Sequence, residues 1–113
     1  MADLSRMREL ARLGHVDYRP DKTYEETANR CDLTYDDAKL KIRTIIQALR
    51  AEHFDTPGRG KPYPPCDVYL FDEQFFNPGT CHFEPIRWYV KIGITEGAAP
   101  RLWVESCHPE GRP

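Results

Sequence analysis

Two cations and a phenol alternate along one segment of the chain, at Arg87, Tyr89 and Lys91. Successive side chains of a β-strand point to opposite faces, so these three share one face. The other face is apolar and carries Trp88, Val90, Ile92 and Ile94. Alternate residues lie about 7 Å apart, which is the scale of a phosphodiester with its flanking base. Such a row can bind a phosphate and stack a base, although it is more often the solvated face of a half-buried strand.

A histidine closes the next predicted strand. Regular alternation places Leu102, Val104, Ser106 and His108 on one face and Trp103, Glu105 and Cys107 on the other. Histidine is the side chain best suited to move protons near neutral pH, so His108 is a candidate proton donor or acceptor beside the strand of Arg87. A surface histidine without a catalytic role explains the same position equally well.

The cysteines are Cys31, Cys66, Cys81 and Cys107, and they form no CxxC pair. We interpret them as free thiols, mostly buried. Two Cys-His dipeptides, at 81–82 and 107–108, supply ligands that zinc accepts. Adjacent strand residues point to opposite faces, so neither dipeptide chelates easily, and we predict no metal and no other cofactor. Cys66 as a nucleophile lacks a base nearby in the sequence.

Three helices are predicted before these strands. They cover Leu4 to Leu13, Thr23 to about Cys31, and Tyr35 to about Glu52, where apolar residues recur at helical spacing. Gly14 is a stop signal for the first helix, and Thr23 with Glu26 forms a capping box for the second. Thr34 is the predicted cap of the third helix.

Three strands are predicted after the helices. They cover Cys66 to Asp72, Ile86 to Thr95 and Leu102 to Cys107, and their short links imply an antiparallel meander. Before them, Thr56 to Pro65 is too rich in proline and glycine for regular structure and is predicted to be a loop that displays Arg59 and Lys61. The tail from Pro109 to Pro113 is expected to fray.

The chain of 113 residues has room for one domain, residues 1–113, of α+β class, with N-terminal helices packed on a C-terminal antiparallel sheet. The net charge of -2 creates no overall field that attracts nucleic acid, so an anionic ligand needs a local patch. No apolar segment is long enough to span a membrane, and the N-terminus lacks the apolar stretch of a signal peptide. A cytoplasmic location is therefore predicted.

Several short strings occur in a familiar order. They are Leu-Ser-Arg-Met-Arg-Glu-Leu-Ala-Arg-Leu-Gly-His-Val near the start, Ala-Leu-Arg-Ala-Glu-His-Phe-Asp at the end of the predicted third helix, and then Cys-Asp-Val-Tyr, Trp-Tyr-Val-Lys-Ile and Leu-Trp-Val-Glu-Ser-Cys-His. In these strings the chain resembles, from Leu4 to His108, the MqsR family of bacterial type II toxin–antitoxin toxins, which are RelE-like messenger RNA interferases.

The resemblance implies a RelE-like domain that cleaves messenger RNA without a metal, by attack of the ribose 2′-hydroxyl, and that a cognate antitoxin neutralises. Tyr89 and Lys91 fall on the family's Tyr-x-Lys strand, which implies a catalytic or substrate-orienting role for Tyr89 and a phosphate-binding role for Lys91. His108 lies near a basic residue of the family and is a candidate acid. Two positions depart from the family pattern. Thr56 stands where the family has a lysine, and Cys66 stands where it has a glutamine.

Arg59, Lys61 and Arg87 are candidate substrate-binding cations, and either loop residue could replace the missing lysine. Three hypotheses follow. The first is an RNA endonuclease toxin. The second is a catalytically inactive RelE-like module that binds protein or RNA. The third is a small zinc protein that uses Cys81, His82, Cys107 and His108.

Overall fold

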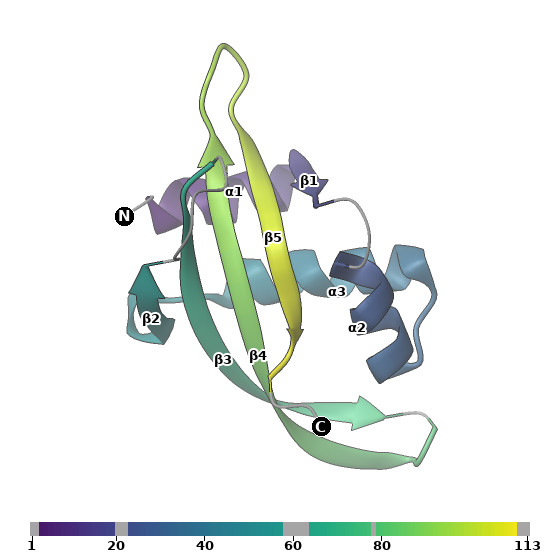
Figure 1. Ribbon diagram of the computed structural model, residues 1–113. Helices are drawn as coiled ribbons and strands as arrows, with labels where there is room; N and C mark the ends of the chain where they lie inside the picture. Colours follow the sequence, from purple (N-terminus) through teal and green to yellow (C-terminus); the bar gives the residue numbers. More distant parts are fainter. Residues whose placement is uncertain (1–2, 20–22, 58–63, 78, 111–113) are drawn as a thin grey trace.

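The structure, a computed structural model, describes residues 3–19, 23–57, 64–77 and 79–110. Three helices, α1 (Leu4–Leu13), α2 (Thr23–Cys31) and α3 (Tyr35–Ala48), precede the long strands of a five-stranded sheet. In Figure 1, α1 and α3 lie behind the sheet and α2 lies beside β5. The predicted α+β class, with helices before the sheet, is confirmed. We call the face that bears Arg87, Tyr89 and Lys91, opposite the core, the open face.

The helices begin and end where local capping dictates. The Asp3 side chain accepts hydrogen bonds from two backbone N–H groups of the first turn of α1, and Gly14 ends this helix with a left-handed φ of +79°, as predicted. The Thr34 hydroxyl accepts a hydrogen bond from the Asp37 N–H (3.1 Å), which confirms the predicted start of α3. The Thr23 side chain, and with it the predicted capping box, lies outside the described residues. None of the described helices is long and apolar enough to cross a membrane.

Two boundaries after the second helix differ from prediction. The third helix ends at Ala48 rather than near Glu52, because the fully buried Leu49 takes an extended backbone that redirects the chain. After a 3-10 turn, η1 (Ala51–His53), the strand β2 (Phe54–Pro57) includes the first two residues of the predicted loop. Proline is tolerated at this edge position because its missing N–H is not needed by the ladder.

The sheet has the strand order β1-β5-β4-β3-β2. Its centre is the predicted antiparallel meander, formed by β3 (Cys66–Asn77), β4 (His82–Thr95) and β5 (Arg101–Pro109). The short β1 (Val16–Tyr18) pairs with β5 in parallel and adds one parallel edge strand to the predicted antiparallel strands, so the whole sheet is mixed. These three strands also extend beyond their predicted ends. Between β3 and β4 the Asn77 carbonyl accepts a hydrogen bond from the Cys81 N–H (2.8 Å), which closes a tight turn. Pro109, expected in a frayed tail, is buried at the end of β5.

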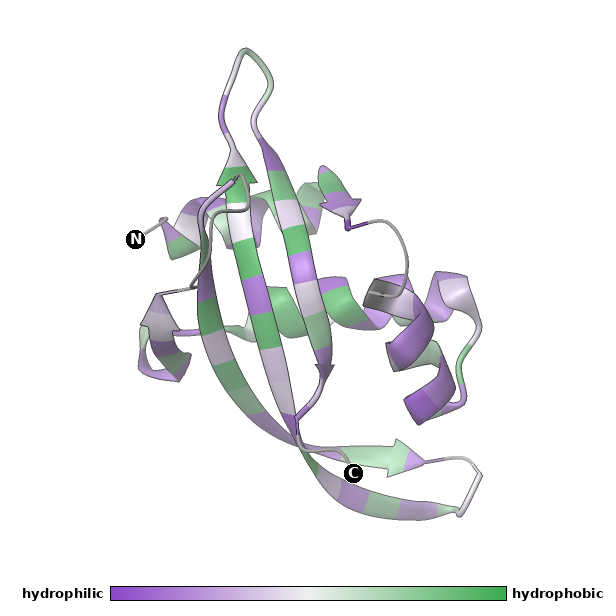
Figure 2. Ribbon diagram, viewed as in Figure 1, coloured by the Kyte–Doolittle hydropathy of each residue, from purple (hydrophilic) through white to green (hydrophobic). Residues whose placement is uncertain are grey.

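The core lies between the helices and one face of the sheet. The predicted core side of β4 is confirmed, because its apolar residues are buried: Trp88, Val90, Ile92 and Ile94. They belong to one cluster with the apolar residues of α3, which are Ile42, Ile45 and Ile46. Figure 2 shows hydrophobic and hydrophilic residues alternating along the central strands. Burial of this face fixes the register and leaves the alternate side chains of β4 on the open face.

The predicted alternation along β5 is wrong beyond Val104. Glu105 is an extra residue in this strand, because Val104 and Ser106 pair with consecutive residues of β4. Such a β-bulge moves the side chains that follow it to the opposite faces. Cys107 is therefore buried in the core, and His108 lies on the open face.

Candidate functional site

The three predicted residues of β4 share the open face. Arg87 is exposed, and Tyr89 and Lys91 are partly buried. Their partners on the neighbouring strand β3 are Asp72, Leu70 and Val68, in that order. Tyr89 and Lys91 therefore lie in the middle of the sheet, between β3 and β5, whereas Arg87 lies just beyond the last pair between β4 and β5.

Tyr89 and His108 form the centre of this row. They pair across β4 and β5, and their rings stack with centroids 5.3 Å apart and an interplanar angle of 21°. The Nδ1 atom of His108 lies 3.0 Å from the carbonyl oxygen of Pro109. A carbonyl oxygen only accepts hydrogen bonds, so Nδ1 carries the hydrogen. In the neutral imidazole Nε2 is then unprotonated and can accept a proton.

The bulge that places His108 beside Tyr89 is anchored by side chains. The Glu105 carboxylate accepts hydrogen bonds from Arg19 Nη1 (3.1 Å) and from Trp103 Nε1 (2.9 Å). These two bonds hold the extra residue in a single arrangement. Nothing in the amino-acid order of β5 marks the bulge. The sequence therefore predicted that His108 belongs to this strand but assigned it to the wrong face.

The environment of Tyr89 keeps its phenol protonated. Partial burial, and then the negative charge of Asp55 on β2, raise the pKa of the Tyr89 phenol. The neutral phenol can donate a hydrogen bond to a phosphate oxygen or to a leaving oxygen. In this arrangement His108 is suited to accept a proton and Tyr89 to donate one.

Backbone closes the end of the open face beyond Lys91. A Cβ on Gly93 would lie 2.2 Å from the carbonyl oxygen of Pro65, so only glycine fits under this segment. Glycine inside a strand is a recognised signal of such an approach. The Cys66 Sγ atom lies here and donates to the Pro64 carbonyl (3.4 Å). Burial raises the pKa of Cys66 to about 11, so this residue remains a thiol and not a nucleophile.

Arg87 is engaged by a carboxylate. Its Nε lies 2.7 Å from Asp72 Oδ1, and its Nη2 lies 3.1 Å from Asp72 Oδ2. The side chains are 53% and 68% exposed, so this two-pronged ion pair faces solvent. Hydrogen bonding to Arg87 lowers the pKa of the Asp72 carboxyl, which stays ionised at neutral pH. A phosphate would have to compete with Asp72 for the guanidinium.

A cavity of about 440 Å³ lies between β2 and the Arg87–Asp72 pair. Its walls include His53, Asp55 and Leu70, and Leu70 is the β3 partner of Tyr89. His53 and Asp55 were not predicted as site residues. The available signal was their place in the string after the third helix, where the resemblance expects a lysine.

Among the residues that the structure describes, the remaining predicted positions add no side chain to the Tyr89–His108 pair. Arg59 and Lys61 lie outside the described residues. All four cysteines are free thiols and three of them are buried, as predicted. Cys81 is exposed at the turn between β3 and β4, whereas Cys107 is buried in the core. In the described ranges, no three His, Cys, Asp or Glu side chains are grouped so that they could hold a metal ion.

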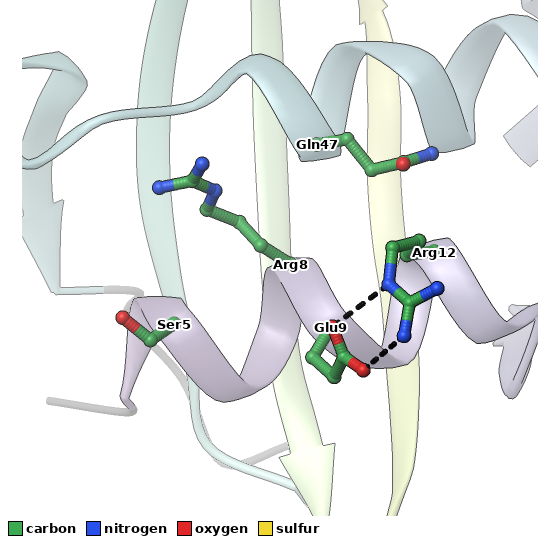
Figure 3. Close-up of a pocket in the computed structure, with 5 residues that line it drawn as sticks. All are labelled: Ser5, Arg8, Glu9, Arg12 and Gln47. Atoms are coloured by element: carbon green, nitrogen blue, oxygen red, sulfur yellow. Dashed lines mark hydrogen bonds and ion pairs between the residues drawn. The ribbon is translucent and has the colours of Figure 1, made fainter.

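A second hollow, of about 330 Å³, lies between α1 and α3. Figure 3 shows its lining residues, which are Ser5, Arg8, Glu9, Arg12 and Gln47. Arg12 Nε donates to Glu9 Oε1 (2.9 Å). None of these residues belongs to the sheet, so this hollow is separate from the Tyr89–His108 site.

The candidate site is thus a stacked phenol and imidazole on an open sheet face, with Lys91 on one side and the Arg87–Asp72 pair on the other. No protein-family model, no curated protein and no solved structure matches the chain.

Proposed function

We propose that this protein is an endoribonuclease that cleaves messenger RNA without a metal. The observation that supports this proposal is the stacked Tyr89–His108 pair beside Lys91. An open face suits a long, flexible strand of RNA, and a proton acceptor, a proton donor and a cation are the groups that RNA cleavage needs. The resemblance to the MqsR family supports a role as the toxin of a type II toxin–antitoxin pair, with a cognate antitoxin as partner and the cytoplasm as its place of action.

The proposed reaction is a transesterification within the RNA strand. His108 Nε2 takes the proton of the ribose 2′-hydroxyl, whose oxygen then attacks the adjacent phosphorus. The bond from phosphorus to the 5′-oxygen breaks, and this oxygen leaves with the proton of the Tyr89 phenol. The products are a 2′,3′-cyclic phosphate and a 5′-hydroxyl. The Lys91 ammonium stabilises the negative charge on the phosphorane oxygens.

The test is cleavage of single-stranded RNA by the purified protein with a metal chelator present. We expect 2′,3′-cyclic phosphate ends. Tyr89→Phe and His108→Ala should each lower the rate by about 10²- to 10⁴-fold, the usual contribution of one acid or base. Tyr35→Phe and His15→Ala are the matched controls, because both residues are exposed and lie outside the face. Intact RNA with the folded protein, or equal rates for the site variants and controls, would refute the proposal.

The alternative is a catalytically inactive module of the same fold that binds protein or RNA. The Arg87–Asp72 pair favours it, because the cation is already neutralised, and so do Thr56 and Cys66, which replace a lysine and a glutamine of the family pattern. RNA binding without cleavage, unaffected by His108→Ala, would support this alternative over the first proposal.

A further inference from the structure

The strands β3 and β4 continue past the strands that flank them. β5 pairs with β4 only from Trp88 onward, and β2 pairs with β3 only as far as Tyr69. Residues 72–77 and 82–87 therefore form a two-stranded ribbon, which in Figure 1 leaves the sheet and curls below α2. One side of the ribbon packs Phe75 and Ile86 against the core.

Two aromatic rings stand on the other side, near the tip of the ribbon. Phe76 and Phe83 pair across the strands, with centroids 5.2 Å apart and planes at 64°. They are 46% and 68% exposed. Large apolar side chains gain stability only when they are buried, and a lone two-stranded ribbon is marginally stable in water. The fold therefore gains little from this pair, which leaves the exposed part of each ring for a ligand.

The rings belong to the face that carries the candidate site. Phe83 precedes Arg87 and Tyr89 on β4 at even spacing, so the three side chains share one face. Phe76 follows Leu70 on β3 at even spacing and shares the same face. At about 3.3 Å per residue, Phe83 lies about 20 Å along the strand from Tyr89. Nucleic-acid bases stack on aromatic side chains displayed by sheets, whatever the base, because every base has a π-face. Continuity with the Tyr89 row favours a nucleic-acid strand over a protein as the occupant.

We infer that Phe76 and Phe83 form a stacking platform for a base of the single-stranded RNA, several nucleotides from the bond that is cut. The inference rests on the proposed function, since the RNA at Tyr89 is the strand that continues to the ribbon. Bases stacked at about 3.4 Å per step need about six nucleotides to cover the distance. A dinucleotide bound at Tyr89 cannot reach the platform.

The experiment compares long and short nucleic acids. Affinity is measured with a labelled single-stranded oligodeoxynucleotide of about ten nucleotides, which lacks the attacking 2′-hydroxyl and cannot be cut. Phe83→Ala should weaken binding by about 5- to 150-fold, the range found for loss of one stacked base. Phe83→Trp should retain the affinity. Cleavage of a ribodinucleotide should not change with Phe83→Ala. Leu40→Ala is the matched control, because Leu40 is 56% exposed and belongs to α3 rather than to the ribbon.

Each outcome decides the inference. Equal binding by Phe83→Ala and the unchanged protein would overturn it. Full affinity in Phe83→Leu would also overturn it, because a branched aliphatic side chain serves a protein contact and cannot stack on a base. Binding that follows the expected pattern without any RNA cleavage would support the platform and reject the proposed enzyme. Cleavage of the dinucleotide, together with no effect of Phe83→Ala on binding of the long oligonucleotide, would support the proposed enzyme and reject the platform.

Discussion

The ion pair between Arg87 and Asp72 gives the sharpest prediction about the open face. Asp72→Asn keeps the size of the side chain and removes its charge, so the guanidinium loses both charged hydrogen bonds, at 2.7 and 3.1 Å. Arg87 then becomes available to a phosphate of the bound strand. The net charge of -2 also becomes one unit less negative. We therefore expect tighter binding of single-stranded nucleic acid at low salt.

The size of the effect follows from counterion release. Each phosphate that is neutralised on a single strand adds about 0.7 to the slope of log K against log salt concentration. Asp72→Asn frees one guanidinium, so the slope should steepen by about 0.7. The affinity of the uncleavable oligodeoxynucleotide is measured by fluorescence anisotropy over a series of salt concentrations. Thermal unfolding should be close to that of the unchanged protein, because both side chains are more than half exposed.

The matched control is Glu9→Gln. It removes the same charge and frees Arg12, but on α1, in the hollow of Figure 3, outside the sheet. If the open face binds the strand, Glu9→Gln leaves the slope unchanged. An equal steepening in both variants would show that any freed arginine serves, and no change in Asp72→Asn would show that Arg87 does not meet a phosphate. Either result would refute the reasoning.

Two further predictions concern stability. Gly93→Ala places a Cβ 2.2 Å from the Pro65 carbonyl oxygen. The free energy of unfolding, measured in urea, should therefore fall by about 1–3 kcal/mol. An unchanged value would mean that the backbone at Pro65 moves aside without cost. Burial raises the pKa of Tyr18 to about 12, whereas the unfolded chain titrates near pH 10. The unfolded state therefore loses this proton first, and the contribution of Tyr18 is complete below about pH 10 and is lost as the pH rises towards about 12. The urea midpoint of unfolding should therefore fall as the pH rises from about 10 to about 12, and Tyr18→Phe should reduce this fall. An equal fall in the variant would show that other groups cause it.

The sequence was sufficient for the parts of the fold that local signals determine. Gly14 and Thr34 end and begin helices through their own backbone and side-chain geometry, and the alternation around Trp88 follows from burial of one face. The edge strand β2 was beyond reach because it is short, and the parallel pairing of β1 with β5 was beyond reach because it joins segments distant in the chain. No local pattern distinguishes such segments from loops.

The residues of the candidate site could be proposed from the sequence, but their arrangement could not. Tyr89 and Lys91 share a face by simple alternation, whereas His108 joins them only because Glu105 inserts one residue into β5. A single insertion reverses every later side chain and leaves no trace in composition. The Arg87–Asp72 pair likewise depends on the register between β3 and β4, which is set by the turn after Asn77.

The strand order also determines when the candidate site can form during synthesis of the chain. β1 is made early, yet it pairs with β5: the Leu102 N–H donates to the His15 carbonyl and the Arg19 N–H donates to the Val104 carbonyl, both at 2.9 Å. Chains emerge from the ribosome with the N-terminal part first, so the early strand waits until the last of the five strands appears. His108 arrives on that same strand. A chain with a complete Tyr89–His108 pair is therefore present only after this whole region has been translated, and a product terminated before β5 would lack the pair.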